Sequence, residues 1–160
     1  WGHSGHDSTR QSIISKNDLA FSFPWLEIKQ NEAYPVFTDA SSDSKAPWLV
    51  TEGSDATGQI NAFFRWKNVS DTAAAFSMEL RLLAPSDVKS TIAFPTESTA
   101  DVTLRRLQKF TVAAGKNCTW EFTRGGTTIA KGNVQADASG LITIPRLVIS
   151  QTPTVLTVKQ

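Results

Sequence analysis

Cysteine is almost absent from this sequence, which holds one, Cys118, in 160 residues. A single thiol cannot close an internal disulfide and is too few for a zinc site, so the fold has to be stabilised by its core. A chain of this length buries roughly 70% of the surface that its unfolded form exposes. Cys118 alternates with Trp120 and Phe122 along an expected strand, which predicts a small buried hydrophobe and not a reactive thiol.

An excess of charge of either sign is missing as well. The chain has 16 Lys and Arg against 15 Asp and Glu, which gives a formal net charge of +1. There is no basic field that would attract nucleic acid, and no apolar run approaches the ~20 residues that span a bilayer. We therefore expect neither a nucleic acid partner nor a membrane span.

Methionine occurs once, at Met78, and the chain begins at Trp1. The translation start is therefore expected elsewhere, and the chain is predicted to be a processed or excised piece of a longer precursor. Residues 1–18 are polar and contain glycine, which predicts a linker or the remnant of a preceding domain. Residues 19–160 are predicted to form one domain.

Amphipathic helical periodicity is also lacking, whereas alternation with period two is frequent. In residues 59–67, Ile60, Ala62, Phe64 and Trp66 fall on one strand face, with Arg65 on the other, which predicts a half-buried strand. The turn at 68–71 is expected to lead into an antiparallel partner at 76–83. Gly125 and Gly126 supply the positive φ angles of a tight hairpin, and residues 137–140 predict another turn. Further strands are predicted at 19–23, 25–28, 35–38, 91–94, 100–112 with a bulge near Arg106, 119–123, 127–131, 141–144, 147–149 and 154–158.

Short strands at this spacing predict an all-β protein. The leading architecture is a two-sheet antiparallel β-sandwich of immunoglobulin or fibronectin-III type, with a jelly roll as the alternative. Trp66 and Trp120 lie on inward faces of their expected strands, so both are predicted to belong to the core.

The amino terminus carries the motif most suggestive of catalysis. Residues 2–6 read Gly-His-Ser-Gly-His, which approaches the Gly-x-Ser-x-Gly elbow that exposes a serine nucleophile in α/β-hydrolases. The fifth residue is His6 and no strand precedes the motif, so Ser4 is not predicted to be a nucleophile. His3 and His6 are spaced like metal ligands, but in a polar terminus we expect them to be solvated. No metal or cofactor is predicted.

The long polar loop at 39–58 suggests ligand binding. Trp48 sits inside it, where an exposed indole offers a platform for a sugar ring, although it is favoured as a plug over the end of the sandwich. Loop carboxylates and amides would supply hydrogen bonds. The candidate carbohydrate-binding residues are Trp48, Trp25, Asp39, Asp43 and Gln59.

Several segments resemble the C-terminal part of secreted bacterial proteins of the α/β-hydrolase type. They are Trp-Gly-His-Ser-Gly-His-Asp-Ser at 1–8, Phe-Pro-Trp-Leu-Glu-Ile at 23–28, Glu-Ala-Tyr-Pro-Val-Phe-Thr-Asp at 32–39 and Gly-Gln-Ile-Asn-Ala-Phe-Phe-Arg-Trp-Lys at 58–67. The closing segment, with Trp-Glu-Phe at 120–122, Gly-Asn-Val at 132–134, Ala-Asp-Ala-Ser-Gly at 136–140 and Leu-Ile-Thr-Ile at 141–144, is similar to the fibronectin-type modules appended to such enzymes.

The resemblance implies an extracytoplasmic location, periplasmic, cell-surface or secreted, with the catalytic domain of the same precursor as partner. A terminal Gly-His loop supplies the last triad member in such hydrolases, so His3 is the matching position and His6 the second choice. The nucleophile and acid would lie upstream, and this chain alone would be inactive. We therefore expect a non-catalytic accessory domain with a structural or substrate-proximity role, or alternatively a carbohydrate-binding module with polysaccharide as its partner.

Overall fold

The computed structural model describes residues 28–43, 63–87 and 93–160, and within these ranges the chain forms eight β-strands and no α-helix. Every strand pair is antiparallel. The strands are β1 (Tyr34–Thr38), β2 (Phe64–Asp71), β3 (Ala75–Leu82), β4 (Glu97–Arg105), β5 (Asn117–Arg124), β6 (Thr127–Gln135), β7 (Thr143–Ser150) and β8 (Thr154–Lys159).

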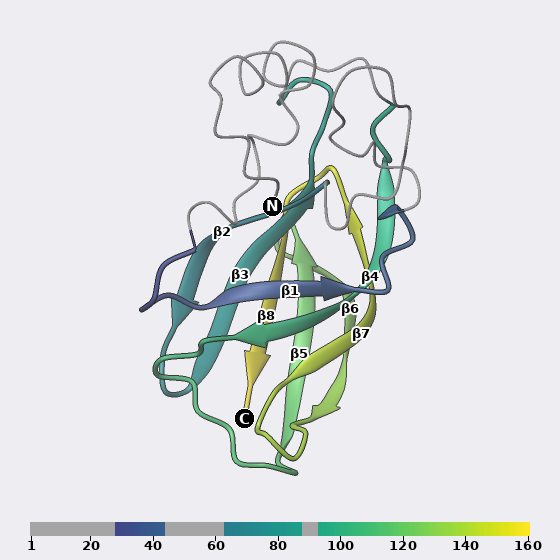
Figure 1. Cartoon of the computed structure of the whole chain (residues 1–160). Coiled ribbons are helices and arrows are strands. Elements are labelled where there is room, and N and C mark those ends of the chain that lie inside the picture. The colour runs from purple at the N-terminus through teal and green to yellow at the C-terminus, as the bar shows by residue number, and fades with distance from the viewer. Residues whose placement is uncertain (1–27, 44–62, 88–92) are drawn as a thin grey trace.

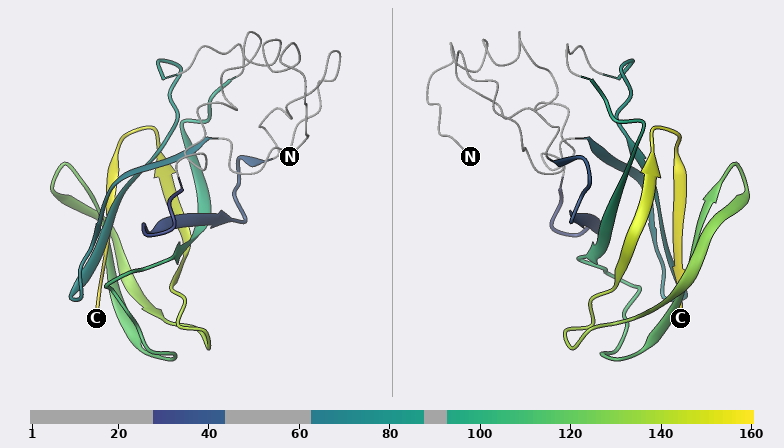
Figure 2. Two further views of the ribbon diagram at one scale, coloured as in Figure 1. Left: turned by 60° about the vertical axis from the view of Figure 1, so that its left-hand side comes forward. Right: turned by 90° about the vertical axis from the view of Figure 1, so that its right-hand side faces the viewer.

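The strands form two sheets that face each other. The small sheet has the order β1-β4-β7 and the large sheet the order β2-β3-β8-β5-β6. In Figure 1, β1 runs across the strands of the large sheet, and the two layers separate in the rotated views of Figure 2. The sheets do not close into a barrel. The predicted all-β, two-sheet antiparallel sandwich is therefore confirmed.

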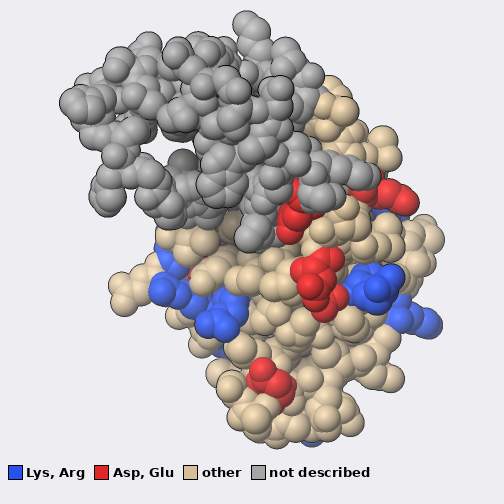
Figure 3. Space-filling model, turned by 45° about the vertical axis from the view of Figure 1, so that its right-hand side comes forward, with Lys and Arg blue, Asp and Glu red and all other residues tan. Residues whose placement is uncertain are grey.

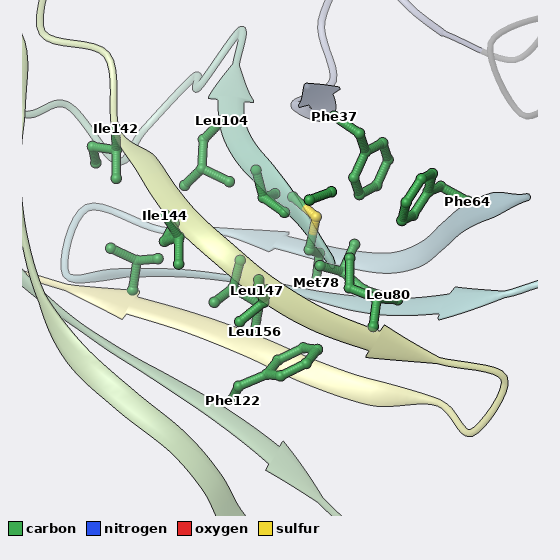
Figure 4. Close-up of a cluster of buried hydrophobic side chains, with 14 of the residues drawn as sticks. Phe37, Phe64, Met78, Leu80, Leu104, Phe122, Ile142, Ile144, Leu147 and Leu156 are labelled. Atoms are coloured by element: carbon green, nitrogen blue, oxygen red, sulfur yellow. The ribbon is translucent and has the colours of Figure 1, made fainter. Parts of the chain in front are cut away.

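Side chains that alternate inward from both sheets make the core. On β3, Phe76, Met78, Leu80 and Leu82 are each fully buried, as the period-two pattern predicts. Figure 4 shows Met78 and Leu80 facing side chains of the small sheet, such as Leu147, between the layers. Burial of a side chain of this size contributes about 1.5–3 kcal/mol before the entropic cost of ordering it, so the alternation in sequence dictates how the sheets face.

Two phenylalanine rings join the sheets near the start of β2. Phe37 of β1 stacks on Phe64 of β2 with ring centroids 4.4 Å apart and an interplanar angle of 15°. The Trp66 ring is tilted against Phe37, with the ring centroids 6.4 Å apart. The ring faces visible in Figure 4 show that the contact spans the gap between the layers. This stack fixes the edge of β2 against β1.

The hairpin and turn of the C-terminal half follow the glycines that the sequence places there. Gly125 and Gly126 have φ angles of 55° and 83° between β5 and β6, and Gly140 has a φ of 76° in the turn after β6. On β6, a Cβ at Gly132 would lie 3.0 Å from the indole nitrogen of Trp120. Glycine there lets the Trp120 ring lie over the strand, half-buried against the core.

Several of the predicted strand boundaries are wrong, and the strands predicted at 141–144 and 147–149 form the single strand β7. Residues 68–71 belong to β2 and form no turn: the register with β3 shifts between Lys67 and Ser70, and Asn68 has a φ of 54°. The chain reverses instead between Thr72 and Ala75, where Thr72 N–H donates to the carbonyl of Ala75. Asparagine tolerates the left-handed conformation, so this position holds a bulge and the strand continues.

The second correction concerns β4, which runs over 97–105 and not 100–112. Arg106 has a φ of 54° and follows the last residue of the strand, so it ends β4 and makes no bulge within it. The register shift of this strand lies between Ala100 and Val102. Phe94 lies in an irregular segment before β4 and packs edge-on against Phe63 at 6.0 Å.

Candidate functional site

Four of the predicted ligand or catalytic residues, His3, Trp25, Trp48 and Gln59, lie outside the described residues. Asp39 and Asp43 are described and flank the turn after β1. Asp39 is exposed with a φ of 52°, and Asp43 is half-buried with its backbone N–H donating to the carbonyl of Ala40. The structure therefore places both near one sheet edge, while their predicted role in binding stays a prediction.

A buried hydroxyl cluster fastens this turn to the start of β4. The Ser98 hydroxyl lies 2.9 Å from that of Ser42 and 3.1 Å from that of Ser41. Ser42 and Ser98 are each 2% exposed, and Thr99 N–H donates to the Ser41 hydroxyl. These hydrogen bonds hold the turn after β1 against the start of β4. Within the described ranges no group of three or more His, Cys, Asp or Glu residues is placed to hold a metal ion.

Acidic side chains elsewhere fasten loops by accepting backbone N–H bonds. Asp71 accepts from the N–H groups of Gln108 at 2.6 Å and Phe110 at 2.7 Å, with Lys109 at 3.3 Å. Asp137 accepts from Ser139 and Leu141 within its own turn. Carboxylates in these positions hold segments that the sheets alone do not fix.

The outer face of β2 and β3 carries an arginine cluster. Arg65 and Arg81 are cross-strand partners, and Arg65 is only 8% exposed although it lies on the face that the sequence pattern makes polar. Its guanidinium donates to the carbonyl of Phe64 at 2.6 Å. Arg81 binds Asp87 in bidentate fashion, at 2.5 and 3.1 Å. This pairing ties the turn after β3 back to the sheet.

Burial and neighbouring charge perturb the pKa values of this cluster. The pKa of Arg65 is lowered to about 9, mainly by burial and secondly by the charge of Arg81, while the charge of Asp87 raises it in part. The hydrogen bond from Arg81 is the main cause that lowers the pKa of Asp87 below 3.8, with the N–H of Ala84 adding to it. Both groups are charged at neutral pH, so Asp87 offsets the repulsion between the two guanidinium groups.

Asp87 predicts a pH-dependent contribution to stability. Because its pKa is lower in the folded chain, ionised Asp87 stabilises the fold above the unfolded pKa near 3.8, and this contribution disappears as the pH falls through the folded pKa. The pair is partly exposed, so we expect a contribution of about 0–1 kcal/mol at pH 7. Urea unfolding of the parent and Asp87→Asn from pH 7 to pH 2 should show the difference vanish at the acidic end. A difference that is constant with pH would contradict the role of the charge.

Cys118 is buried, 2% exposed, and burial raises the pKa of its thiol above 9.0. The nucleophilic thiolate is therefore scarce at neutral pH and shielded from reagents. We expect modification by a soluble disulfide reagent at pH 7.5 to be at least about 100-fold slower in the native chain than in urea. The single cysteine makes the signal unambiguous, and equal rates in both states would show that the thiol is accessible.

The described residues form two hollows on either side of the β2 edge, and both include Trp66 and Lys67. One, of about 290 Å³, lies over the arginine cluster. The other, of about 210 Å³, is lined by residues of β2 and of the segment that leads into β1. Both of these elements lie at the left of Figure 1. The second hollow, here called the Trp66 hollow, is lined by Ile28, Lys29, Glu32, Ala33, Tyr34, Trp66, Lys67, Asn68 and Val69.

The walls of the Trp66 hollow are anchored. Ala33 is buried, and the Gln30 carbonyl accepts a hydrogen bond from Arg106 at 3.4 Å. On the other wall, the Asn68 amide donates to Glu79 at 3.2 Å. The hollow is smaller than the ~300 Å³ at which sites for drug-sized ligands begin, so it has room for a single ring or side chain.

Charge on the rest of the visible surface is mixed. On the face shown in Figure 3, basic and acidic side chains form separate small groups among uncharged ones. Within the described part of the chain there is no helix long and apolar enough to cross a membrane. Comparison with protein-family models, with curated proteins and with solved structures finds no match to this chain.

The sequence pattern did not reveal the Trp66 hollow. Trp66 was predicted to be a core residue, and it does pack against the core, yet it also lines the hollow. Tyr34 carried no signal of its own, because it stands just before an expected strand. Tyr34 and Trp66 line the same hollow only because β1 of the small sheet packs against β2 of the large sheet.

Proposed function

We propose that this chain is a non-catalytic β-sandwich accessory domain of an exported hydrolase, with a structural or substrate-proximity role. The observation that carries the proposal is the structural use of its acidic residues. Asp71, Asp87 and Asp137 each accept backbone N–H bonds that fasten turns or loops. General acids, bases and nucleophiles have to face a substrate, whereas these carboxylates are committed to holding the scaffold.

The resemblance at residues 1–8 and 120–144 supports the assignment to a secreted hydrolase with an appended immunoglobulin- or fibronectin-III-like module. In that arrangement His3 completes a serine triad whose nucleophile and acid lie in the preceding domain. The sandwich then supports the catalytic domain or keeps it near its substrate.

The test is to sequence the gene upstream of the codon for Trp1. We expect a strand, a Gly-x-Ser-x-Gly elbow and a helix to be encoded there. In the complete protein, His3→Ala should then lower kcat for ester hydrolysis by at least about 10³-fold, and a loss of that size in His6→Ala instead would assign the triad position to His6. A signal peptide that ends at Trp1 would contradict the hydrolase assignment.

Carbohydrate binding is the second candidate function, and the Trp66 hollow favours it. Aromatic rings beside groups that both donate and accept hydrogen bonds are what a sugar ring requires. Trp48, which the sequence predicts as a platform for a sugar ring, is a competing position for the same function.

A further inference from the structure

We propose that the Trp66 hollow binds one pyranose ring of a neutral polysaccharide. The inference rests on the proposed substrate-proximity role and names the class of polymer that the domain would hold. It places the binding site at Trp66 and Tyr34 and not at Trp48.

The two aromatic side chains provide the apolar part of the site. Trp66 and Tyr34 are both half-buried and line the same hollow, so each ring is held by packing while part of it borders the cavity. The C–H groups on one face of a pyranose are weakly positive, and they are attracted to the negative face of an aromatic ring. Fixed rings bind with little loss of side-chain entropy.

The polar rim matches hydroxyl groups. The Lys29 ammonium lies 3.5 Å from the Glu32 carboxylate, and the two side chains are 69% and 46% exposed. Neighbouring hydroxyls of a sugar can accept from such an ammonium and donate to the carboxylate at the same time. Asn68 also lines the hollow, and its amide nitrogen donates to Glu79.

Charge at the rim favours a neutral ligand. Lys29 is paired with Glu32, and the Lys67 ammonium is paired at 3.2 Å with Glu79, which lines the other hollow, so each ammonium already has a counter-ion. A charged ligand of either sign would meet a like charge of the Lys29–Glu32 pair at close range. An apolar side chain would bury the rim groups without hydrogen bonds, which costs free energy. A hydroxyl-rich ring avoids both penalties.

The site is tested by titrating the full 160-residue chain with soluble xylan, mixed-linkage glucan and galactomannan, with polygalacturonate as the charged comparison. We expect at least one neutral polymer to bind. The double variant Lys29→Ala/Glu32→Ala should weaken that binding about tenfold, because two hydrogen bonds from largely solvent-exposed side chains are lost. Trp66→Phe should weaken it about threefold.

Matched controls separate the site from general effects. Glu121→Ala/Lys131→Ala removes the same residue types from a cross-strand pair on β5 and β6, and Trp120→Phe makes the same change at a half-buried tryptophan outside the hollow. Both should bind like the parent, and circular dichroism should show that all variants are folded. The site is supported if the variants in the hollow bind more weakly and the control variants bind like the parent.

Several results would overturn the site. These are binding of no neutral polymer, binding of polygalacturonate alone, or binding that Trp48→Ala abolishes and Lys29→Ala/Glu32→Ala leaves unchanged. None of them bears on the non-catalytic role itself, which is judged by hydrolysis and not by binding.

Discussion

Replacing Phe64 by alanine is expected to lower the free energy of unfolding by about 3–5 kcal/mol. Phe64 is 1% exposed, and its ring stacks on Phe37 of the opposite sheet. The substitution removes a buried aromatic ring and leaves a cavity where the two sheets are joined. Urea unfolding followed by circular dichroism measures the loss, with the slope against urea unchanged if the chain remains two-state.

Ile129→Ala is the control for Phe64→Ala. Ile129 is 46% exposed on the edge strand β6, so its truncation should change the unfolding free energy by less than about 0.5 kcal/mol. Equal losses in the two variants would show that the Phe37–Phe64 stack does not join the sheets. Because Trp66 leans on Phe37, Phe64→Ala should also disturb the wall of the Trp66 hollow.

Asp71→Asn is expected to cost about 2 kcal/mol. The Asp71 carboxylate holds the segment after β4 by accepting from the N–H groups of Gln108 and Phe110, and Phe110 is fully buried. An amide keeps one accepting oxygen but points its NH₂ group at a backbone donor. Hydrogen bonds to charged groups contribute about 1.5–3 kcal/mol, and part of this is lost with the charge.

Asp39→Asn makes the same chemical change at an exposed aspartate. Asparagine tolerates the left-handed conformation of that position, where φ is 52°, so the unfolding free energy should move by less than about 0.5 kcal/mol. Thermal or urea unfolding of both variants separates the two cases. If Asp71→Asn is as stable as Asp39→Asn, the carboxylate does not hold the segment.

The strands that the sequence predicts best are those with regular alternation. Phe76, Met78, Leu80 and Leu82 recur every second residue, and all four are buried on one face of β3. The β5–β6 hairpin is equally well predicted because Gly125 and Gly126 readily adopt the positive φ angles of a tight turn. The local sequence pattern is enough to predict a strand where the face that the pattern makes apolar is also the face that the sheet buries.

Prediction from the sequence failed where both faces of a strand are covered. Phe63, Phe64 and Arg65 are buried in succession, which alternation along a half-buried strand does not anticipate. The bulge at Asn68 depends on the register with β3, and strand order depends on pairing between distant segments. For the same reason the Trp66 hollow, whose walls come from β2 and the segment before β1, could not be found from spacing.

The proposal that the chain is a non-catalytic domain is tested most directly by measuring hydrolysis of p-nitrophenyl acetate by the purified 160-residue chain. We expect a rate equal to that of Ser4→Ala and of an unrelated protein at the same concentration. Catalytic turnover by the parent that Ser4→Ala abolishes would contradict it, because the chain would then carry a working nucleophile of its own.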